Sequence, residues 1–380
     1  MHIELTEEQK LLQETVRRFA EEVAKPRAKE IDQTGEFPRS FFDQAGEIGL
    51  AGVFIPEEYG GGGMDTVSYC IAIEEISRVC ATSGVILSVN NSLVCYPLLK
   101  FGTEEQKKEF LTPLAAGQKL GCFALTEPGA GSDPSGLRST ARREGDDYIL
   151  NGNKVFITNG TDADIALVFA SVDLAKRHKG ITCFIVPADT PGYHHGTHEF
   201  KLGVNASGTT ELSFDNCRIP ASYRLGEEGE GFKIAMATLD GGRIGIAAQA
   251  VGIAQGAFEE ALAYSQEREQ FNQKLAEFQA IQFYLADMAT EIDAGRLMTW
   301  KAAWAKENQK RFSLEAAQAK LFTSEMAQRV TNKALQIHGG YGYTKEYNVE
   351  RFFRDARILE IYEGTSEVQK MVIADWVLKA

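Results

Sequence analysis

The sequence predicts an α+β protein of several domains, in which a helical region is followed by a β region and then by long helices. Two changes in hydrophobic periodicity carry this prediction. Apolar residues recur at helical spacing up to about residue 120, alternate in short runs over 121–230, and return to helical spacing after Phe232. A length of 380 residues fits two or three domains. We expect an N-terminal helical domain at 1–120, a middle β domain at 121–230 and a C-terminal helical bundle domain at 231–380.

The N-terminal helices begin with a clear start signal. Thr6 and Gln9 match a capping box, and the apolar residues that follow keep helical spacing up to Pro26. Further helices are expected from Thr66 and over residues 92–101.

The middle region contains short runs of β-branched and aromatic residues separated by turn residues, which is typical of strands. Strands are expected within residues 147–158, 165–172, 181–186 and 211–214. Asn151-Gly152 stands between two apolar runs and predicts a hairpin turn. In the C-terminal region, apolar stripes predict long helices over residues 244–270, 278–308, 313–338 and 366–378.

The chain is acidic, with 53 Asp and Glu against 40 Lys and Arg and a net charge of −13. Nucleic acids and anionic membrane surfaces bind cationic patches, so we expect neither as a partner. No segment of about 20 apolar residues is apparent, which argues against a membrane span. The N-terminus lacks the basic and apolar regions of a targeting signal, and the six cysteines form no CxxC pair. We therefore expect a cytoplasmic protein with reduced thiols.

Motifs of several common enzyme classes are missing from the sequence. No GxGxxG lies between a strand and a helix, which argues against a dinucleotide-binding Rossmann fold, and no GxSxG supports a serine hydrolase. The histidines at 194, 195 and 198 have no acidic or cysteine partner at metal-ligand spacing. We interpret them as part of a polar loop and expect no metal site.

Two segments have compositions suited to a site. Residues 122–133 predict a strand that enters a glycine-rich turn. Such a turn either exposes backbone N–H groups to a polar cofactor or is an ordinary tight turn. Glu363-Gly364-Thr365 interrupts helical sequence near the C-terminus. Glu363 is therefore either a carboxylate directed into a cleft or a solvated acid near a helix end.

Five segments are informative together: LTEPGAGSD (125–133), NGNKVFITNG (151–160), LDGGR (239–243), QIHGGYG (336–342) and IYEGT (361–365). In this order they resemble the acyl-CoA dehydrogenase family over essentially the whole chain, most closely its short-chain, butyryl-CoA members. The resemblance implies an N-terminal helical domain, a middle β-barrel or sandwich domain and a C-terminal four-helix bundle. It also implies a homotetramer, built as a dimer of dimers, in which subunits share the cofactor site.

The cofactor implied by the resemblance is FAD. The β-domain wall of the flavin site is implied for Phe123, Leu125, Thr126, Ser132, Phe156, Ile157 and Thr158, with Thr158 near the flavin N5 atom. The adenine and pyrophosphate are implied to contact a second group across a subunit interface: Arg268, Phe271, Gln279, Gln336, Gly339 and Gly340. Thr365 and Glu367 match further FAD contacts. A guanidinium suits a pyrophosphate, although Arg268 taken alone would be a surface helix arginine. Asn272 departs from the glycine that is usual in the family.

The resemblance assigns the catalytic base to Glu363 and the acyl-CoA site to Ser132, Asp240, Arg243 and Gly364. Some relatives carry the base immediately before the arginine of the LDGGR segment. Here that residue is Gly242, which cannot abstract a proton, so the assignment to Glu363 is strengthened. Residues 84–87 lack the arginine with which glutaryl-CoA members hold a second carboxylate, so a dicarboxylic substrate is not expected.

The implied reaction is α,β-dehydrogenation of a short-chain acyl-CoA to trans-2-enoyl-CoA, with electrons passed to an electron-transfer flavoprotein. The acyl group stays open among short straight, methyl-branched and alicyclic chains. Two alternatives come from the same superfamily. A DNA-binding flavoprotein of an alkylation response is opposed by the net charge, and an acyl-CoA oxidase usually carries an additional C-terminal domain.

Overall fold

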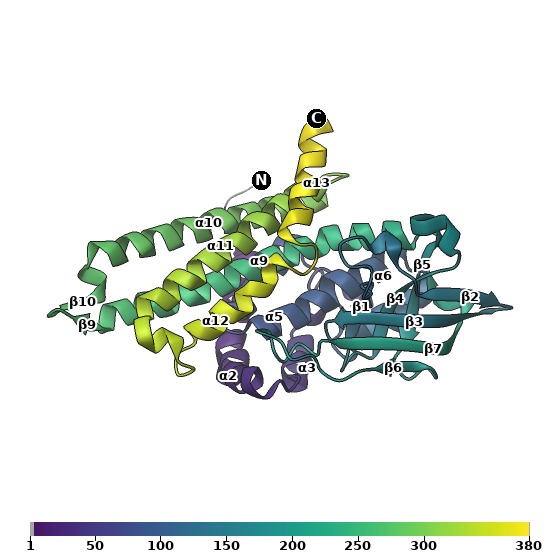
Figure 1. Ribbon diagram of the computed structural model, residues 1–380, viewed down its shortest axis with the longest axis horizontal. Coiled ribbons are helices and arrows are strands. Elements are labelled where there is room, and N and C mark those ends of the chain that lie inside the picture. Colours follow the sequence, from purple (N-terminus) through teal and green to yellow (C-terminus); the bar gives the residue numbers. More distant parts are fainter. Residues whose placement is uncertain (1–3, 380) are drawn as a thin grey trace.

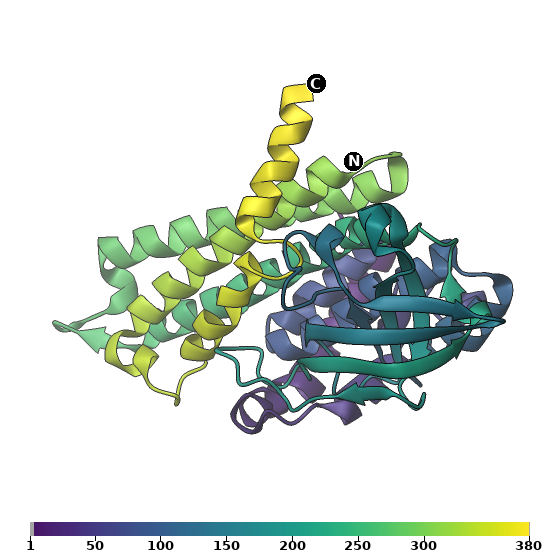
Figure 2. The same cartoon turned by 45° about the vertical axis from the view of Figure 1, so that its right-hand side comes forward.

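A computed structural model describes residues 4–379 of the chain. Helices form the N-terminal region, an eight-stranded sheet follows, and long helices form the C-terminal region (Figure 1). The predicted fold class is therefore confirmed. The molecule is elongated, with the sheet at one end and the far ends of the long helices at the other (Figures 1 and 2).

The N-terminal helices are α1 (Glu7–Phe19), α2 (Lys25–Thr34), α3 (Arg39–Glu47), α4 (Thr66–Ser77), α5 (Ala81–Ser88), α6 (Tyr96–Phe101), α7 (Glu104–Gln106) and α8 (Thr112–Ala115). The predicted capping box is present at α1. The Thr6 hydroxyl accepts a hydrogen bond from Gln9 N–H at 3.2 Å, and the Gln9 side chain accepts one from Thr6 N–H at 3.1 Å. Both bonds satisfy N–H groups that a helix end would otherwise leave free.

Residues 81–101 form one long apolar helix, which corrects the expectation that the chain has no such segment. A π-helical stretch, Val89–Cys95, joins α5 to α6, and the 21 residues have a mean hydropathy of 1.2. By length and composition alone this helix could cross a membrane, and it is the one that passes this test within the described chain. However, 78% of its window is buried inside the fold, so its apolar surface is covered by protein. The sequence pattern was missed because polar residues such as Asn90 and Asn91 interrupt it.

Those buried asparagines attach the helix to its surroundings. The Asn90 side chain donates to the Ala51 carbonyl at 2.8 Å and accepts from Gly121 N–H, at the start of the first strand, at 3.0 Å. The Asn91 side chain donates to Leu50 O at 2.9 Å and accepts from Val53 N–H at 2.8 Å. Buried amides need such partners, and here they fix the sheet to the helical region.

The middle region is a sheet with the strand order β6-β7-β3-β2-β4-β5-β8, and β1 pairs with β4. Its strands are β1 (Gly121–Ala124), β2 (Thr140–Glu144), β3 (Asp147–Ile157), β4 (Ile165–Ser171), β5 (Ile181–Pro187), β6 (Tyr193–His195), β7 (Thr210–Pro220) and β8 (Arg224–Leu225). The pairing is antiparallel except where β4 meets β1 and β2.

The predicted hairpin turn at Asn151-Gly152 is wrong. Both residues lie inside β3, and the hairpin turn between β2 and β3 is Gly145-Asp146, six residues earlier in the chain, where Glu144 pairs with Asp147. The register between β3 and β7 shifts at this point, which indicates a bulge. Gly152 is required because a Cβ there would be 2.3 Å from Ser139 Oγ. A close approach of two backbones therefore produced the glycine signal that resembled a turn.

The C-terminal helices are α9 (Gly231–Glu267), α10 (Gln279–Asn308), α11 (Ser313–His338), α12 (Val349–Ala356) and α13 (Ser366–Lys379). The three long helices α9, α10 and α11 lie side by side, and α13 projects away from them (Figures 1 and 2). Their interior is lined by alanines and aliphatic side chains such as Ile246, Ile292 and Met326. Small residues let the helices pack closely over their full length.

Helix α9 also packs tightly on the N-terminal region. A Cβ on Gly252 would be 2.3 Å from the Glu74 carbonyl of α4, and one on Gly256 would be 2.0 Å from the Arg78 carbonyl. The missing side chains therefore let the two backbones touch. Through these contacts α9 connects the two helical regions and carries the LDGGR segment toward the sheet.

Candidate active site

Glu363 stands on a strained turn between a short 3₁₀ helix (Arg357–Glu360) and α13. The φ angles of Glu363 and Gly364 are 51° and 93°, so both residues are in the left-handed region. Glycine adopts this conformation at little cost, whereas a residue with a side chain rarely does. Thr365 then caps α13, because its hydroxyl accepts a hydrogen bond from Val368 N–H at 3.4 Å. The Glu-Gly-Thr sequence thus ends one helical segment and starts the next.

The Glu363 carboxylate lies directly over Gly242 of α9. A Cβ built on Gly242 would be 2.1 Å from Glu363 Oε2 and 2.7 Å from Leu93 Cδ2. Within residues 4–379, Oε2 is buried and has no hydrogen-bond partner. Burial raises the pKa of Glu363 to about 7, although the charges of Lys320 and Arg243 lower it. The group is therefore balanced between its acid and base forms near neutral pH.

An apolar wall lies beside this carboxylate and approaches it at Leu93. It is formed by Val85, Val89 and Leu93 of the long helix, with Phe123, Leu239 and Tyr362 packed against them. The Tyr362 hydroxyl donates to the Gln249 side-chain oxygen, and the Gln249 amide donates to the Ala81 carbonyl at 2.9 Å. These bonds fix the residue next to Glu363 against α5 and α9. The wall explains the raised pKa, because apolar surroundings disfavour the charged carboxylate.

Arg243, the residue after Gly242, forms an ion pair with Asp240 one turn earlier on α9. Arg243 Nη1 is 2.6 Å from Asp240 Oδ1, and the Ser313 hydroxyl donates to the other carboxylate oxygen. Arg243 is 6% exposed, and its Nε atom is buried without a partner in the described part of the chain. Burial lowers the pKa of Arg243, and Asp240 and Glu363 raise it. The structure therefore places this predicted substrate residue inside the site, near the base, with one donor unused.

The predicted flavin wall gathers at the end of β1 and the end of β3. Val155 N–H donates to the Thr126 carbonyl at 2.9 Å, which brings the two segments together. Phe123, Thr126 and Thr158 are partly exposed, and Phe156 is 69% exposed at a φ of 58°. Ser132 is exposed on the turn that follows β1. Phe123 also belongs to the apolar wall around Glu363, so this surface adjoins the base within one chain.

Two of the predicted wall residues point elsewhere. Leu125 packs in the core beneath the sheet, and Ile157 is 1% exposed in the core on the sheet's other face. Neither side chain is therefore available to a ligand. Behind the turn, Lys154 Nζ is 2.7 Å from Glu127 Oε1, and both side chains are buried. Glu127 also accepts from the N–H groups of Arg138 and Ser139. This buried pair holds the turn against β3.

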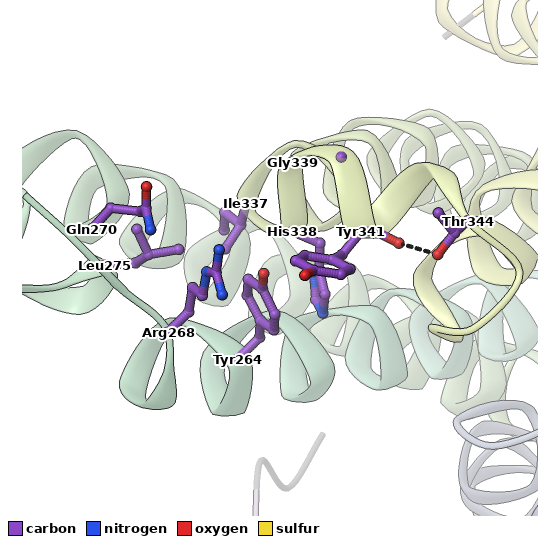
Figure 3. A pocket seen from close by; sticks show the side chains of 10 residues that line it. Tyr264, Arg268, Gln270, Leu275, Ile337, His338, Gly339, Tyr341 and Thr344 are labelled. Carbon is purple, nitrogen blue, oxygen red and sulfur yellow. Dashed lines mark hydrogen bonds between the residues drawn. The ribbon is translucent and has the colours of Figure 1, made fainter.

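The second group of predicted FAD residues lies at the other end of the molecule, where α9 and α11 end. There a pocket of about 480 Å³ is lined by residues that include Arg268, Gly339 and Gly340 (Figure 3). The Arg268 guanidinium stacks over Tyr341 at 5.3 Å, and Tyr264 stacks on His338 at 4.2 Å. A Cβ on either glycine would meet no atom within 4 Å, so the backbone there borders open space. This arrangement fits an aromatic and anionic ligand such as the ADP part of FAD.

The remaining predicted residues of this group are exposed near the same pocket. Gln336 precedes it on α11, and Gln279 starts α10. Phe271 is 87% exposed on the tip between α9 and α10. Phe271 and Asn272 have φ angles of 54° and 62°. The glycine expected at 272 is therefore replaced by asparagine, the residue with a side chain that best tolerates this conformation.

Glu367 is exposed in the first turn of α13, close to the base but far from the pocket in Figure 3. The predicted FAD residues thus form two separate groups in one chain, one beside the sheet and one at the opposite end of the long helices. For the described residues, no group of three or more His, Cys, Asp or Glu side chains could hold a metal ion.

Sequence reasoning missed several residues that contact the base turn. Lys320 of α11 is fully buried and donates to the Gly364 carbonyl at 2.7 Å. Gln369 of α13 is also fully buried and donates to the same carbonyl at 2.8 Å. A signal for Lys320 was present, because it occupies the apolar stripe of α11 between Ala316 and Ala327. A lysine in a buried stripe needs a partner.

Comparisons with known proteins agree along the whole chain. The acyl-CoA dehydrogenase N-terminal, middle and C-terminal domain families match residues 6–118, 122–217 and 229–378. The short-chain specific acyl-CoA dehydrogenase of Rattus norvegicus mitochondria is 51% identical over 378 residues, which cover 100% of this chain and 92% of that protein.

Solved structures give the same result. Butyryl-CoA dehydrogenase from Megasphaera elsdenii has a TM-score of 0.98 and 47% identity, with 100% of both chains covered. A chain from a study of the electron transferring flavoprotein of Acidaminococcus fermentans and flavin-based electron bifurcation has a TM-score of 0.99 and 48% identity, again with 100% of both chains covered. The chain belongs to the acyl-CoA dehydrogenase family and is an oxidoreductase of that family.

Proposed function

We propose that the protein converts a short-chain acyl-CoA to trans-2-enoyl-CoA with FAD, and that Glu363 removes the α-proton. The observation that carries this proposal is the Glu363 carboxylate, whose Oε2 atom is buried beside an apolar wall and has no hydrogen-bond partner in the described part of the chain. A carboxylate in this environment is a stronger base than one in water. It is also free to accept a proton from a substrate.

Residues of the chain divide the work around that carboxylate. The apolar wall receives the acyl chain and excludes water, and Gly242 leaves room for the carboxylate. The unused donor of Arg243 is available to a polar part of the substrate near the thioester. When bound, FAD supplies the acceptor for the β-hydrogen and its electron pair. Thr158 and the surface formed by Phe123 and Thr126 would hold the flavin ring beside the base.

The two groups of predicted FAD residues support an assembly of at least two chains. Arg268, Gly339 and Gly340 lie where α9 and α11 end, at the end of the long helices that is away from the sheet, whereas Thr158 follows β3 beside α5 (Figure 1). One FAD therefore reaches both groups only if a second copy supplies one of them. We propose the homotetramer that the family resemblance implies, with each cofactor held between two subunits.

The physiological acceptor is proposed to be an electron-transfer flavoprotein. Support comes from the structural neighbour solved in a study of such a protein. A short acyl group is supported by the relatives, which are named as short-chain specific acyl-CoA dehydrogenases. Straight, methyl-branched and alicyclic acyl groups are distinguished by measuring flavin bleaching with a panel of acyl-CoA thioesters.

The direct test follows the flavin absorbance of purified protein under anaerobic conditions. Butyryl-CoA or a close analogue is expected to bleach the wild-type flavin, and Glu363→Gln is expected to abolish bleaching while FAD stays bound. Glu360→Gln is the matched control, because it makes the same change three residues earlier in an exposed pair with Arg357. Equal bleaching by wild type and Glu363→Gln would contradict the base assignment. A yellow protein that no acyl-CoA bleaches would contradict the proposed substrate class, and rapid oxygen consumption would indicate an oxidase.

A further inference from the structure

The ammonium group of Lys320 is buried beside the base turn without a carboxylate partner. Its side chain is fully buried on α11. Among the described residues, no carboxylate oxygen lies within 4.0 Å of Nζ; instead Nζ donates to the Gly364 carbonyl at 2.7 Å. Burying a charge is costly unless it is paired, and surface lysines avoid this cost. The position of Lys320 therefore needs an explanation beyond packing.

The carbonyl that Lys320 contacts belongs to the strained part of the site. Gln369 Nε2, also buried, donates to Gly364 O at 2.8 Å and to Glu363 O at 3.3 Å. Two buried donors thus converge on one carbonyl oxygen. The residues that carry these oxygens have φ angles of 51° and 93°. A left-handed glutamate persists only when surrounding contacts determine its conformation.

The direction in which the Glu363 side chain leaves the turn is important, because the space for its carboxylate is narrow. Glu363 Oε2 occupies the volume that a side chain at Gly242 would fill, and Leu93 limits it on another side. A small rotation of the Gly364 peptide would move the carboxylate out of this space.

We propose that Lys320 is a positioning residue for the catalytic base: by holding the Gly364 carbonyl together with Gln369, it fixes the left-handed turn that keeps the Glu363 carboxylate over Gly242. This proposal rests on the proposed function only for the kinetic effects that it predicts. The conformational part concerns contacts within the chain and is testable by itself.

The charge of Lys320 also affects the protonation of Glu363. Burial lowers the pKa of Lys320 to about 8, and the nearby carboxylate of Glu363 raises it. Conversely, Lys320 is the cation that lowers the pKa of Glu363 most, against the larger effect of burial. The other charged or titratable groups that face this pair are Arg243, Glu360, Glu367, Tyr69 and Tyr362. Replacing Lys320 by an uncharged residue therefore shifts the titration of Glu363 to higher pH.

The test uses Lys320→Met, which keeps an unbranched side chain one atom shorter and removes the donor and charge. Lys320→Arg keeps both and serves as the conservative variant. Lys370→Met is the matched control, because Lys370 also bridges α13 to α11, through an exposed pair with Glu325 at 3.2 Å. Hydrogen–deuterium exchange of the FAD-loaded protein is measured by mass spectrometry over residues 358–369. Steady-state kinetics are measured from pH 6 to pH 9.

Lys320→Met is expected to increase deuterium uptake over residues 358–369 severalfold, without a change in peptides from the first half of α10. It should lower kcat about 100-fold, because a displacement near 1 Å has effects of this size, with a much smaller change in KM. The acid limb of the kcat profile should move up by about one pH unit. Lys320→Arg should recover part of kcat, and Lys370→Met should match wild type.

The proposal is overturned if Lys320→Met folds, binds FAD and shows wild-type exchange at the turn. It is also overturned if kcat falls while the exchange and the acid limb both stay unchanged, because the lysine would then act only through general stability. If none of the acyl-CoA thioesters bleaches the flavin of the wild-type protein, the proposed function fails. The exchange comparison still decides whether Lys320 holds the turn. If Lys320→Met does not fold, Gln369→Leu removes the other donor to the same carbonyl and is expected to raise exchange over the same residues.

Discussion

The substitution Gly242→Ala tests the geometry of the site with a single methyl group. In the structure, that methyl carbon would be 2.1 Å from Glu363 Oε2, 2.7 Å from Leu93 Cδ2 and 3.0 Å from Glu363 Cδ. No backbone atom stands closer. The carboxylate is the mobile end of a side chain, so it yields first. It must move by at least about 1.3 Å before the contact reaches an ordinary van der Waals distance of 3.4 Å.

The size of the expected effect follows from that displacement. A misplacement of about 1 Å at the reacting group costs about 100-fold in rate. The cost in stability should be moderate, because an overpacked core position costs about 1–3 kcal/mol. Alanine in place of glycine inside a helix offsets about 1 kcal/mol of this. The variant should therefore fold and bind FAD while losing nearly all turnover.

The assay is anaerobic flavin bleaching with butyryl-CoA in a stopped-flow spectrophotometer, together with thermal unfolding. Gly241→Ala is the matched control on the same helix. A Cβ at Gly241 would meet only Lys306 Nζ, at 4.0 Å, so the helix gains the same propensity without a clash. Gly241→Ala should bleach at the wild-type rate. A bleaching rate of Gly242→Ala within threefold of wild type would refute the placement of Glu363 over Gly242.

Three further predictions concern other parts of the site. The raised pKa of Glu363 means that its contribution to stability is present below pH 4.5 and is lost as pH rises through about 7. Glu363→Gln should therefore gain up to about 3 kcal/mol of unfolding free energy over wild type between pH 5 and pH 8, as measured by urea denaturation; no difference would contradict the burial argument. Arg268→Met should weaken FAD binding about 10- to 100-fold, as measured by flavin fluorescence, because it removes a charged hydrogen-bond donor. Lys154→Met should cost about 3–5 kcal/mol of unfolding free energy by leaving Glu127 buried and unpaired, and adding Glu127→Gln should recover part of that loss.

Periodicity was enough to predict the order of helical, β and helical regions, because each long element has one buried face. Periodicity failed where a residue type has more than one structural role and the local sequence does not show which role applies. Gly152 resembled a turn glycine, but its role is a close approach to Ser139 within a continuous strand. The helix over residues 81–101 was not seen as one apolar unit, because its asparagines are buried and hydrogen-bonded to backbone groups. The partners of these hydrogen bonds lie in distant segments of the chain, so a local sequence pattern does not reveal them.

The candidate site shows the same division. The resemblance to a family identified Glu363 and the flavin wall. The residues alone left two interpretations of Glu363: a carboxylate directed into a cleft, or a solvated acid near a helix end. The structure adds the convergence of Glu363, Gly242 and Leu93, which come from three separate parts of the chain. It also adds Lys320 and Gln369, whose relevance depends on the direction of one carbonyl group. Side-chain chemistry was readable from the sequence, but three-dimensional convergence was not.

The position of the base explains why the site needs so many internal contacts. A carboxylate carried on a regular helix, as a residue at 242 would be, is oriented by the helix itself. Glu363 is carried instead on a two-residue left-handed turn, which has no repeating hydrogen bonds to hold it. If residue 242 were also a glutamate, its carboxylate would lie so close to that of Glu363 that the two could not both be ionised. A single base must therefore come from position 242 or from position 363. With glycine at 242, the chain places its base on the turn, and the turn's orientation then depends on donors such as Lys320 and Gln369.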